Sequence, residues 1–155
     1  MNKSIIIMLL CFVGFFSGCR SNLILERIKE HGVNRRNTKK LKFTSSEGAY
    51  GGNFFVVIED PKVISYVWDS LESAKPTKLW YASGFHKIEF YADRKDQESA
   101  VTVRLNMSNA AHVEGDMWYH SDSKKEGYYG LWECKGLAEL VMKYLKQEYE
   151  RKQRQ

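Results

Sequence analysis

GFHKIEFYADRKDQESAVTVRLNM, residues 84–107, predicts two strands joined by a polar loop. In the second half the apolar residues fall on alternate positions, the period of a strand with one buried face: Val101, Val103, Leu105 and Met107. In the first half, Ile88 and Phe90 share the buried face, and the charged residues beside them face the other way. This pair of strands is therefore expected at the centre of a sheet.

Two helical patterns are expected to cover that sheet. Residues 61–72 repeat apolar side chains at helical spacing, and Asp60 and Pro61 supply the cap and the first helical residue. A second apolar stripe follows near the end of the chain: Leu137, Leu140, Val141, Tyr144 and Leu145. Because each helix has one apolar stripe, we expect both to lie on the same face of the sheet.

Further runs of apolar or alternating residues predict strands at 41–44, 53–58, 111–120 and 128–132. Residues 41–44 are expected at an edge of the sheet. Residues 53–58 are apolar at nearly every position, so both faces of that strand are expected to be at least partly covered. Within 111–120, the alternation predicts that three side chains face inward: Val113, Met117 and Tyr119. Trp80 and Tyr81 are placed in a loop.

The expected fold class is therefore α+β. It is a two-layer domain, residues 43–155, with an antiparallel sheet of four to five strands and two helices packed on one face. This β-α-β4-α order resembles the fold of the TATA-binding-protein type in element order only, so the resemblance implies nothing about function.

The first 19 residues carry a targeting signal. Lys3 supplies a positive start, and residues 5–16 supply an apolar run of about a dozen residues, which is too short to span a bilayer. Phe16-Ser17-Gly18-Cys19 then resembles the lipobox of bacterial lipoproteins, with Phe where Leu is typical. The resemblance implies removal of residues 1–18, transfer of a diacylglycerol to the sulfur of Cys19 and acylation of its amino group, typically with palmitate. The alternative is an ordinary secretory signal that ends near a cysteine.

The same resemblance implies a location in the cell envelope. Arg20 follows the cysteine directly, and it is not the Asp that retains such proteins in the inner membrane of enteric bacteria. We therefore expect the protein on the outer membrane, facing the periplasm, in a host that has one.

Residues 19–42 form a basic segment that is expected to act as a tether. From Arg20 to Lys42 there are eight basic and two acidic residues, a net charge of +6. The whole chain carries +5 and Lys3 contributes +1, which leaves −2 for residues 43–155. A basic tether can lie on anionic lipid headgroups, or it can be an extended, solvated linker. Within it, residues 23–28 are compatible with a short amphipathic helix.

Cysteine usage limits redox chemistry. Cys11 leaves with the signal and Cys19 is acylated, so Cys134 is the only thiol expected in the mature chain and no internal disulfide can form. Cys134 lies three residues before Leu137, and this position predicts burial against the last helix.

The sheet face that the helices leave open is the expected binding surface. Its candidate partner-binding residues are Phe85, Tyr91, Arg104 and Trp118, because large aromatics on a polar face are typical of protein-binding surfaces. A weaker candidate is a divalent metal site built from alternate residues of one strand: His112, Glu114, Asp116 and His120. The simpler alternative is a solvated face on which Arg104 pairs with Glu114.

Sequence motifs of catalysis are missing: there is no nucleophile elbow, phosphate-binding Gly loop, HExxH or CxxC. A non-enzymatic protein without a cofactor is therefore expected. Nucleic acid is not an expected partner, because the basic residues lie beside the membrane anchor. The first hypothesis is a lipid-anchored module that binds a protein or another envelope component. The second is a metal- or small-molecule-binding lipoprotein that uses the open sheet face.

Overall fold

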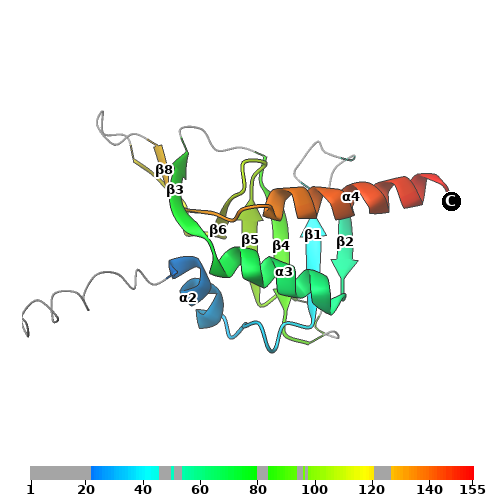
Figure 1. Cartoon of the computed structure of the whole chain (residues 1–155), viewed down its shortest axis with the longest axis horizontal. Helices are drawn as coiled ribbons and strands as arrows, with labels where there is room; N and C mark the ends of the chain where they lie inside the picture. Colours follow the sequence, from blue (N-terminus) through cyan, green and yellow to red (C-terminus); the bar gives the residue numbers. More distant parts are fainter. Residues whose placement is uncertain are drawn as a thin grey trace, which may run out of the picture.

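The computed structural model describes residues 22–45, 50, 54–79, 84–93, 96, 98–120 and 127–155 (Figure 1). The helices are α2 (Leu23–Glu30), α3 (Pro61–Glu72) and α4 (Leu137–Gln153). The strands are β1 (Lys40–Thr44), β2 (Phe55–Ile58), β3 (Lys75–Leu79), β4 (His86–Tyr91), β5 (Val101–Leu105), β6 (Ala110–Val113), β7 (Trp118–His120) and β8 (Gly127–Glu133). Every pair of neighbouring strands is antiparallel, so the predicted α+β class is confirmed. The predicted signal, the predicted lipobox and the predicted loop with Trp80 and Tyr81 lie outside the described residues.

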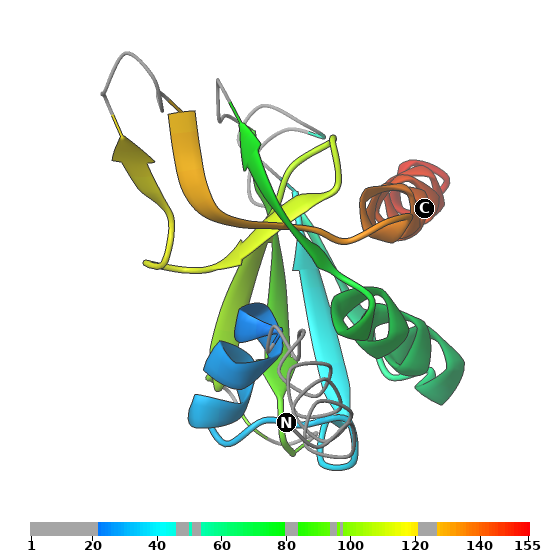
Figure 2. The same ribbon diagram turned by 60° about the vertical axis from the view of Figure 1, so that its left-hand side comes forward.

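A single sheet runs in the order β2-β1-β4-β5-β6-β8-β3, and β7 pairs with β8 off this path. β6 pairs with the end of β8 at Trp132 and Glu133, while β7 pairs with its beginning, from Gly127 to Tyr129. Figure 2 shows the orange β8 curving away from the upright strands β1, β4 and β5. Gly130 lies within β8 with φ of 76°, a backbone conformation that favours glycine and suits a bend in a strand. The sheet is therefore strongly bent at its β3–β8 end.

The central strand pair is as the sequence predicts. Ile88 pairs with Val103 and Phe90 with Val101, and all four side chains are buried. Met107 is the exception, because β5 ends at Leu105 and the Met107 side chain is 60% exposed. The strand ends there because the side-chain oxygen of Asn106 accepts hydrogen bonds from the backbone N–H groups of the next turn, at Ser108 and Ala110.

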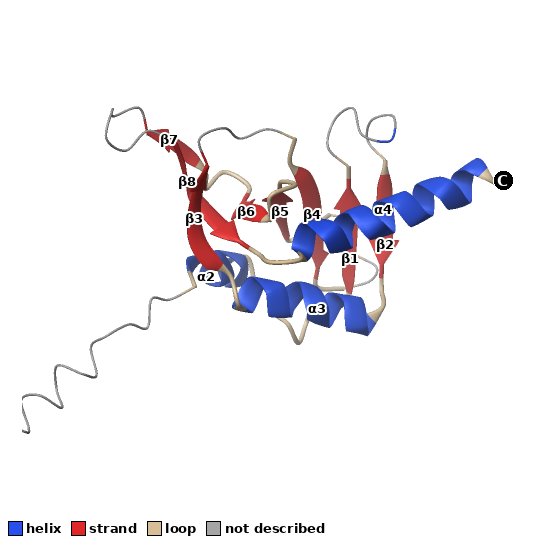
Figure 3. Cartoon of the chain, turned by 45° about the horizontal axis from the view of Figure 1, so that its top comes forward, coloured by secondary structure: helices blue, strands red, loops and turns tan. Residues whose placement is uncertain are grey.

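The two predicted helices, α3 and α4, lie together on one side of the sheet (Figure 3). At the start of α3, the side chain of Asp60 accepts a hydrogen bond from the backbone N–H of Lys62 at 2.8 Å, and Pro61 is the first helical residue, as predicted. At the start of α4, Gly136 offers no side-chain cap. Asn109 takes its place from a distant turn, since its Oδ1 accepts from the N–H of Ala138 at 2.7 Å.

The sheet is larger than predicted, and its edges differ. β1 lies between β2 and β4 rather than at an edge, and β2 is the edge strand. One face of β2 is only partly covered, since Phe55 and Val57 are 43% and 46% exposed. β3 was not predicted, because Lys75–Leu79 has no apolar alternation. A proline is tolerated there because an edge strand has one side on which no N–H is required.

The predicted strand 111–120 is interrupted. The chain turns between β6 and β7 at Glu114 and Gly115, and Gly115 has φ of 97°. Val113 is buried as predicted, but the alternation does not continue through the turn, so Asp116 and Trp118 are not placed by the period of β6.

The segment predicted to be a tether is packed into the folded unit. Ile24, Ile28 and Val33 are at most 2% exposed and belong to the hydrophobic core. The Asn22 side chain donates a hydrogen bond to the carbonyl of Leu71 at 2.6 Å, which fixes α2 beside the C-terminal end of α3. The predicted domain boundary at residue 43 is therefore too late. The helix α2, which was not counted among the two predicted helices, lies within this segment.

Basic residues of this segment meet the acidic remainder of the chain. Arg35 lies 2.6 Å from Asp69 and 3.1 Å from Glu72, and Lys42 lies 2.9 Å from Glu89. The net charge of +6 on residues 20–42 and the net charge of −2 on residues 43–155 therefore partly neutralise each other within the fold. Fewer of these cations are left to contact lipid headgroups.

Candidate functional site

An apolar cleft of about 720 Å³ lies between α2 and the bent end of the sheet. Its walls come from α2, β3, β6, β7, β8 and the turn between β6 and β7: Leu23, Ile24, Arg27, Pro76, Thr77, Val113, Asp116, Trp118, Tyr129, Gly130, Leu131 and Trp132. We call this the α2 cleft. It exists because α2 packs against β6 and the C-terminal end of α3 and leaves the curved strand β8 uncovered beside it. Its volume lies within the range of about 300–1,000 Å³ that is usual for small-molecule sites.

Large apolar side chains stand at the cleft without being buried. Trp118 is 57% exposed and stacks on Tyr129, with ring centroids 6.1 Å apart and an interplanar angle of 21°. Leu23, across the cleft on α2, is 53% exposed. Gly130 makes the position of Trp118 feasible, because a Cβ atom at Gly130 would lie 2.7 Å from the Trp118 ring. The cleft therefore offers an aromatic wall with access to solvent, which is typical of binding surfaces.

The charged residues that line the α2 cleft, Arg27 and Asp116, form an ion pair with each other. The Nε and Nη2 atoms of Arg27 each donate to a carboxylate oxygen of Asp116 at 2.9 Å. Nη1 of Arg27 donates to Glu30 at 2.7 Å. The hydrogen bonds to Asp116 and then to Glu30 raise the pKa of Arg27, so its charge is permanent. Of these three charged residues only Arg27 and Asp116 line the cleft, so the charge at its wall is balanced.

Among the described residues, no Ser, Cys or His side chain lines the α2 cleft. Cys134 is fully buried in the core, as predicted, and burial raises the pKa of its thiol to about 12. A thiol that stays protonated is neither a nucleophile nor a metal ligand at neutral pH. What this arrangement can do chemically is hold an apolar group, with Arg27 and Asp116 beside it for hydrogen bonding.

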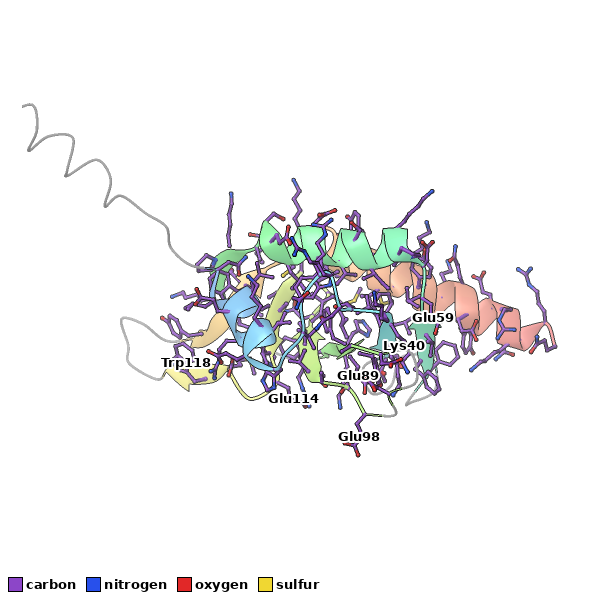
Figure 4. The ribbon with its side chains drawn as sticks, turned by 90° about the horizontal axis from the view of Figure 1, so that it is seen from below. Lys40, Glu59, Glu89, Glu98, Glu114 and Trp118 are labelled. Atoms are coloured by element: carbon purple, nitrogen blue, oxygen red, sulfur yellow. The ribbon has the colours of Figure 1, made fainter. Side chains whose placement is uncertain are left out.

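The predicted partner-binding residues are not brought together. Tyr91 is only 4% exposed and lies under the ammonium group of Lys40, 4.2 Å from the ring centroid. Arg104 on β5 lies opposite Lys87 on the neighbouring strand β4. Lys87 and Tyr91 are four residues apart, which corresponds to about 13 Å along a strand. Trp118 belongs to the β7–β8 ribbon; in Figure 4 it lies at one end of the molecule, away from Glu89. The predicted patch of Tyr91, Arg104 and Trp118 is therefore not contiguous.

Phe85 and the central part of that face are used in packing and ion pairing. The Phe85 ring lies edge-on to the His112 ring, with centroids 4.9 Å apart, and it helps to bury His112 to 3% exposure. The guanidinium of Arg104 hydrogen-bonds to Glu114, the cross-strand pair of the simpler alternative. This contact lowers the pKa of Glu114. Glu89 and Glu114 both lie on the side of the sheet away from α3 (Figure 4).

The predicted metal ligands diverge. Burial, followed by the charge of Arg104, lowers the pKa of His112 to about 4, and within the described part of the chain its Nδ1 has no hydrogen-bond partner. Glu114 turns to Arg104, and Asp116 turns to Arg27 in the α2 cleft. The side chain of His120 lies outside what the structure describes. Among the residues that are described, no group of three or more His, Cys, Asp or Glu side chains is placed to hold a metal ion.

The sequence analysis missed most of the α2 cleft. Leu23, Ile24 and Arg27 fall in the segment assigned to the tether, and Pro76 and Thr77 fall in the strand that was not predicted. One signal was present, the amphipathic pattern of residues 23–28, because a helix with an apolar stripe requires a surface to cover it.

Comparison with known proteins adds no assignment: no family model, no curated protein and no solved structure matches this chain. Within the described part of the chain, no helix combines the length and the apolar character needed to cross a bilayer.

Proposed function

We propose that this protein is a lipid-anchored binding protein of the bacterial cell envelope, and that it holds the apolar part of an envelope molecule in the α2 cleft. The cleft itself carries the proposal: about 720 Å³ with mainly apolar walls and the half-exposed Trp118 at its side. The class of function is binding without catalysis, since Arg27 and Asp116 engage each other and the nearby thiol is buried.

The position of the cleft in the chain supports an envelope ligand. Leu23 is the first residue of α2 and lines the cleft, and it follows the proposed acylation site, Cys19, by four residues. Four residues span at most about 14 Å. If Cys19 is anchored in a bilayer, the α2 cleft therefore lies close to the headgroups, where amphiphilic molecules are available. Arg20 after the cysteine favours the outer membrane, on its periplasmic side.

Probe binding tests the cleft. Every residue of the described core lies between Ile24 and Leu145, so a protein comprising residues 22–155 keeps all the described core contacts. We expect this protein to bind a naphthylamine dye whose fluorescence rises in apolar surroundings. Trp118→Ala should weaken binding by roughly tenfold, about 1.4 kcal/mol, and cost only about 1 kcal/mol of stability because the side chain is 57% exposed.

Met107→Ala is the matched control, since Met107 is also an exposed apolar residue, at 60%, but does not line the cleft. Dye binding that is absent, or that Trp118→Ala and Met107→Ala change equally, would show that the α2 cleft is not a ligand site. Unfolding of the domain by Trp118→Ala would instead mean that this side chain is part of the core.

Metabolic labelling tests the anchor. Cells that express the full chain should incorporate labelled palmitate into the protein, and Cys19→Ala should abolish the label and leave an uncleaved precursor. Cys134→Ala is the control and should keep the label, because Cys134 is buried in the folded unit. Absence of label in the unsubstituted protein, with normal processing of Cys19→Ala, would indicate an ordinary secreted protein.

A further inference from the structure

β2 is the edge strand at one end of the described sheet. The backbone N–H of Ser45 donates to the carbonyl of Phe54 at 2.8 Å, so the backbone groups of residues 54, 56 and 58 point toward β1. The N–H and C=O groups of Phe55 and Val57 therefore point away from the sheet. No other strand of the described chain pairs with this edge.

The opposite edge of the sheet path is protected, whereas β2 is not. β3 carries Pro76, which has no N–H, together with Lys75 and Lys78. Proline and lysine are the residues that keep an edge strand from pairing with another chain. The sequence of β2 is Phe-Val-Val-Ile, without a charge or a proline, and the outward side chains of Phe55 and Val57 are 43% and 46% exposed. The composition of β2 therefore favours pairing.

α4 continues past β2, and no strand of the described chain lies beneath its last turns (Figures 1 and 3). This last part of α4 contacts the start of β2, because the Tyr149 ring packs edge-on against the Phe54 ring with centroids 5.7 Å apart. Lys152 places its ammonium group 4.9 Å from the centroid of the Phe54 ring and 5.7 Å from that of Phe55. A positive charge thus stands at the N-terminal end of β2, and Glu59 lies exposed just past its C-terminal end.

We propose that β2 pairs antiparallel with β2 of a second copy of this chain, around a two-fold axis at Val56. In this register Phe55 of one copy exchanges both backbone hydrogen bonds with Val57 of the other, so the outward-pointing groups of the two edges pair with each other. Antiparallel pairing also brings Lys152 of each copy toward Glu59 of the other, twice by symmetry. The two sheets become continuous across the two β2 strands. This inference is independent of the α2 cleft.

The register makes a position-specific prediction. Val56 lies opposite its own counterpart as a pair without hydrogen bonds, with Cα atoms about 4.5 Å apart, which is within the range of a disulfide. Phe55 lies opposite Val57, so the two copies of Phe55 are diagonal to each other and about 7–8 Å or more apart, beyond that range. A cysteine at position 56 should therefore cross-link the two copies, and a cysteine at position 55 should not.

The test uses the full chain expressed in bacteria, treated with a mild oxidant and resolved without reductant. Val56→Cys should give about tenfold more disulfide-linked dimer than Phe55→Cys, by the distances above. The unsubstituted chain measures the background from its own cysteines, and Cys134 adds little to it because it is fully buried. Equal cross-linking by the two variants, or none above background, would overturn the proposal.

A charge exchange tests the same pairing without a cysteine, and it covers the case in which Val56→Cys does not fold. The mass of the full chain in detergent is measured over a range of concentrations. Glu59→Lys and Lys152→Glu should each raise the dimer dissociation constant roughly tenfold, and the double variant should restore it. A monomer at all concentrations, or two single changes whose effects simply add in the double variant, would contradict the interface. In that case Lys152 protects the edge of β2 instead.

Discussion

Ile28→Ala tests whether α2 belongs to the folded unit or to a tether. Ile28 is fully buried in the core cluster, and truncation to alanine removes three carbon atoms. At about 0.8 kcal/mol per buried methylene, the lost transfer free energy is about 2.4 kcal/mol. The cavity left behind adds to this, so we expect a loss of about 3–4 kcal/mol in the free energy of unfolding. Against a total of about 5–15 kcal/mol for a typical domain, this is a large fraction.

Urea unfolding of residues 22–155 measures the effect, with tryptophan fluorescence as the signal. Trp68 is a suitable reporter because it is 1% exposed and donates a hydrogen bond from Nε1 to Thr38 at 3.2 Å. The midpoint should fall while the slope stays unchanged, since α2 unfolds together with the rest. Glu26→Ala, at an exposed position of the same helix, should change stability by less than about 0.5 kcal/mol. Equal effects of the two substitutions would refute the packing of α2 in the core.

Three further predictions concern His112, Cys134 and Asn109. His112 is neutral in the fold at neutral pH, with its pKa lowered to about 4. The folded state therefore binds fewer protons than the unfolded state between pH 6.5 and 4. The free energy of unfolding should fall by on the order of 2 kcal/mol as the pH is lowered through that window. Acid titration of unfolding should be shallower in His112→Leu than in the exposed control His31→Gln. Cys134, whose thiol pKa burial raises to about 12, should react with a thiol reagent much more slowly in the native protein than in denaturant; equal rates would place it at the surface. Asn109→Ala should cost about 1–2 kcal/mol in thermal or urea unfolding, because it removes the cap of α4 and leaves an alanine at φ of 61°, whereas Ser108→Ala nearby should cost little.

Local patterns in the sequence determined the centre of this fold. The alternation in residues 84–107 placed Ile88, Phe90, Val101 and Val103 in the core, and helical spacing with a cap at Asp60 placed α3. Burial of Cys134 followed from its position just before the apolar stripe of α4. These predictions succeeded because a period of two or 3.6 residues depends only on neighbours along the chain. By contrast, Trp118 was assigned to the open face by extending such a period through Gly115, where the chain turns.

Only the tertiary structure decided where the basic segment lies and where the cleft forms. Arg27 and Asp116 meet across 89 residues of sequence, and Asn22 bonds to Leu71 across 49. Neither contact has a local signal, because a solvated tether and a docked amphipathic helix share the same composition. The same holds for β3: its Lys-Pro-Thr-Lys-Leu sequence becomes a strand through pairing with residues of β8 that lie 49 to 58 positions further along the chain. The targeting signal and Cys19 remain predictions of the sequence alone. The α2 cleft exists because these long-range contacts place α2 beside the bend of β8.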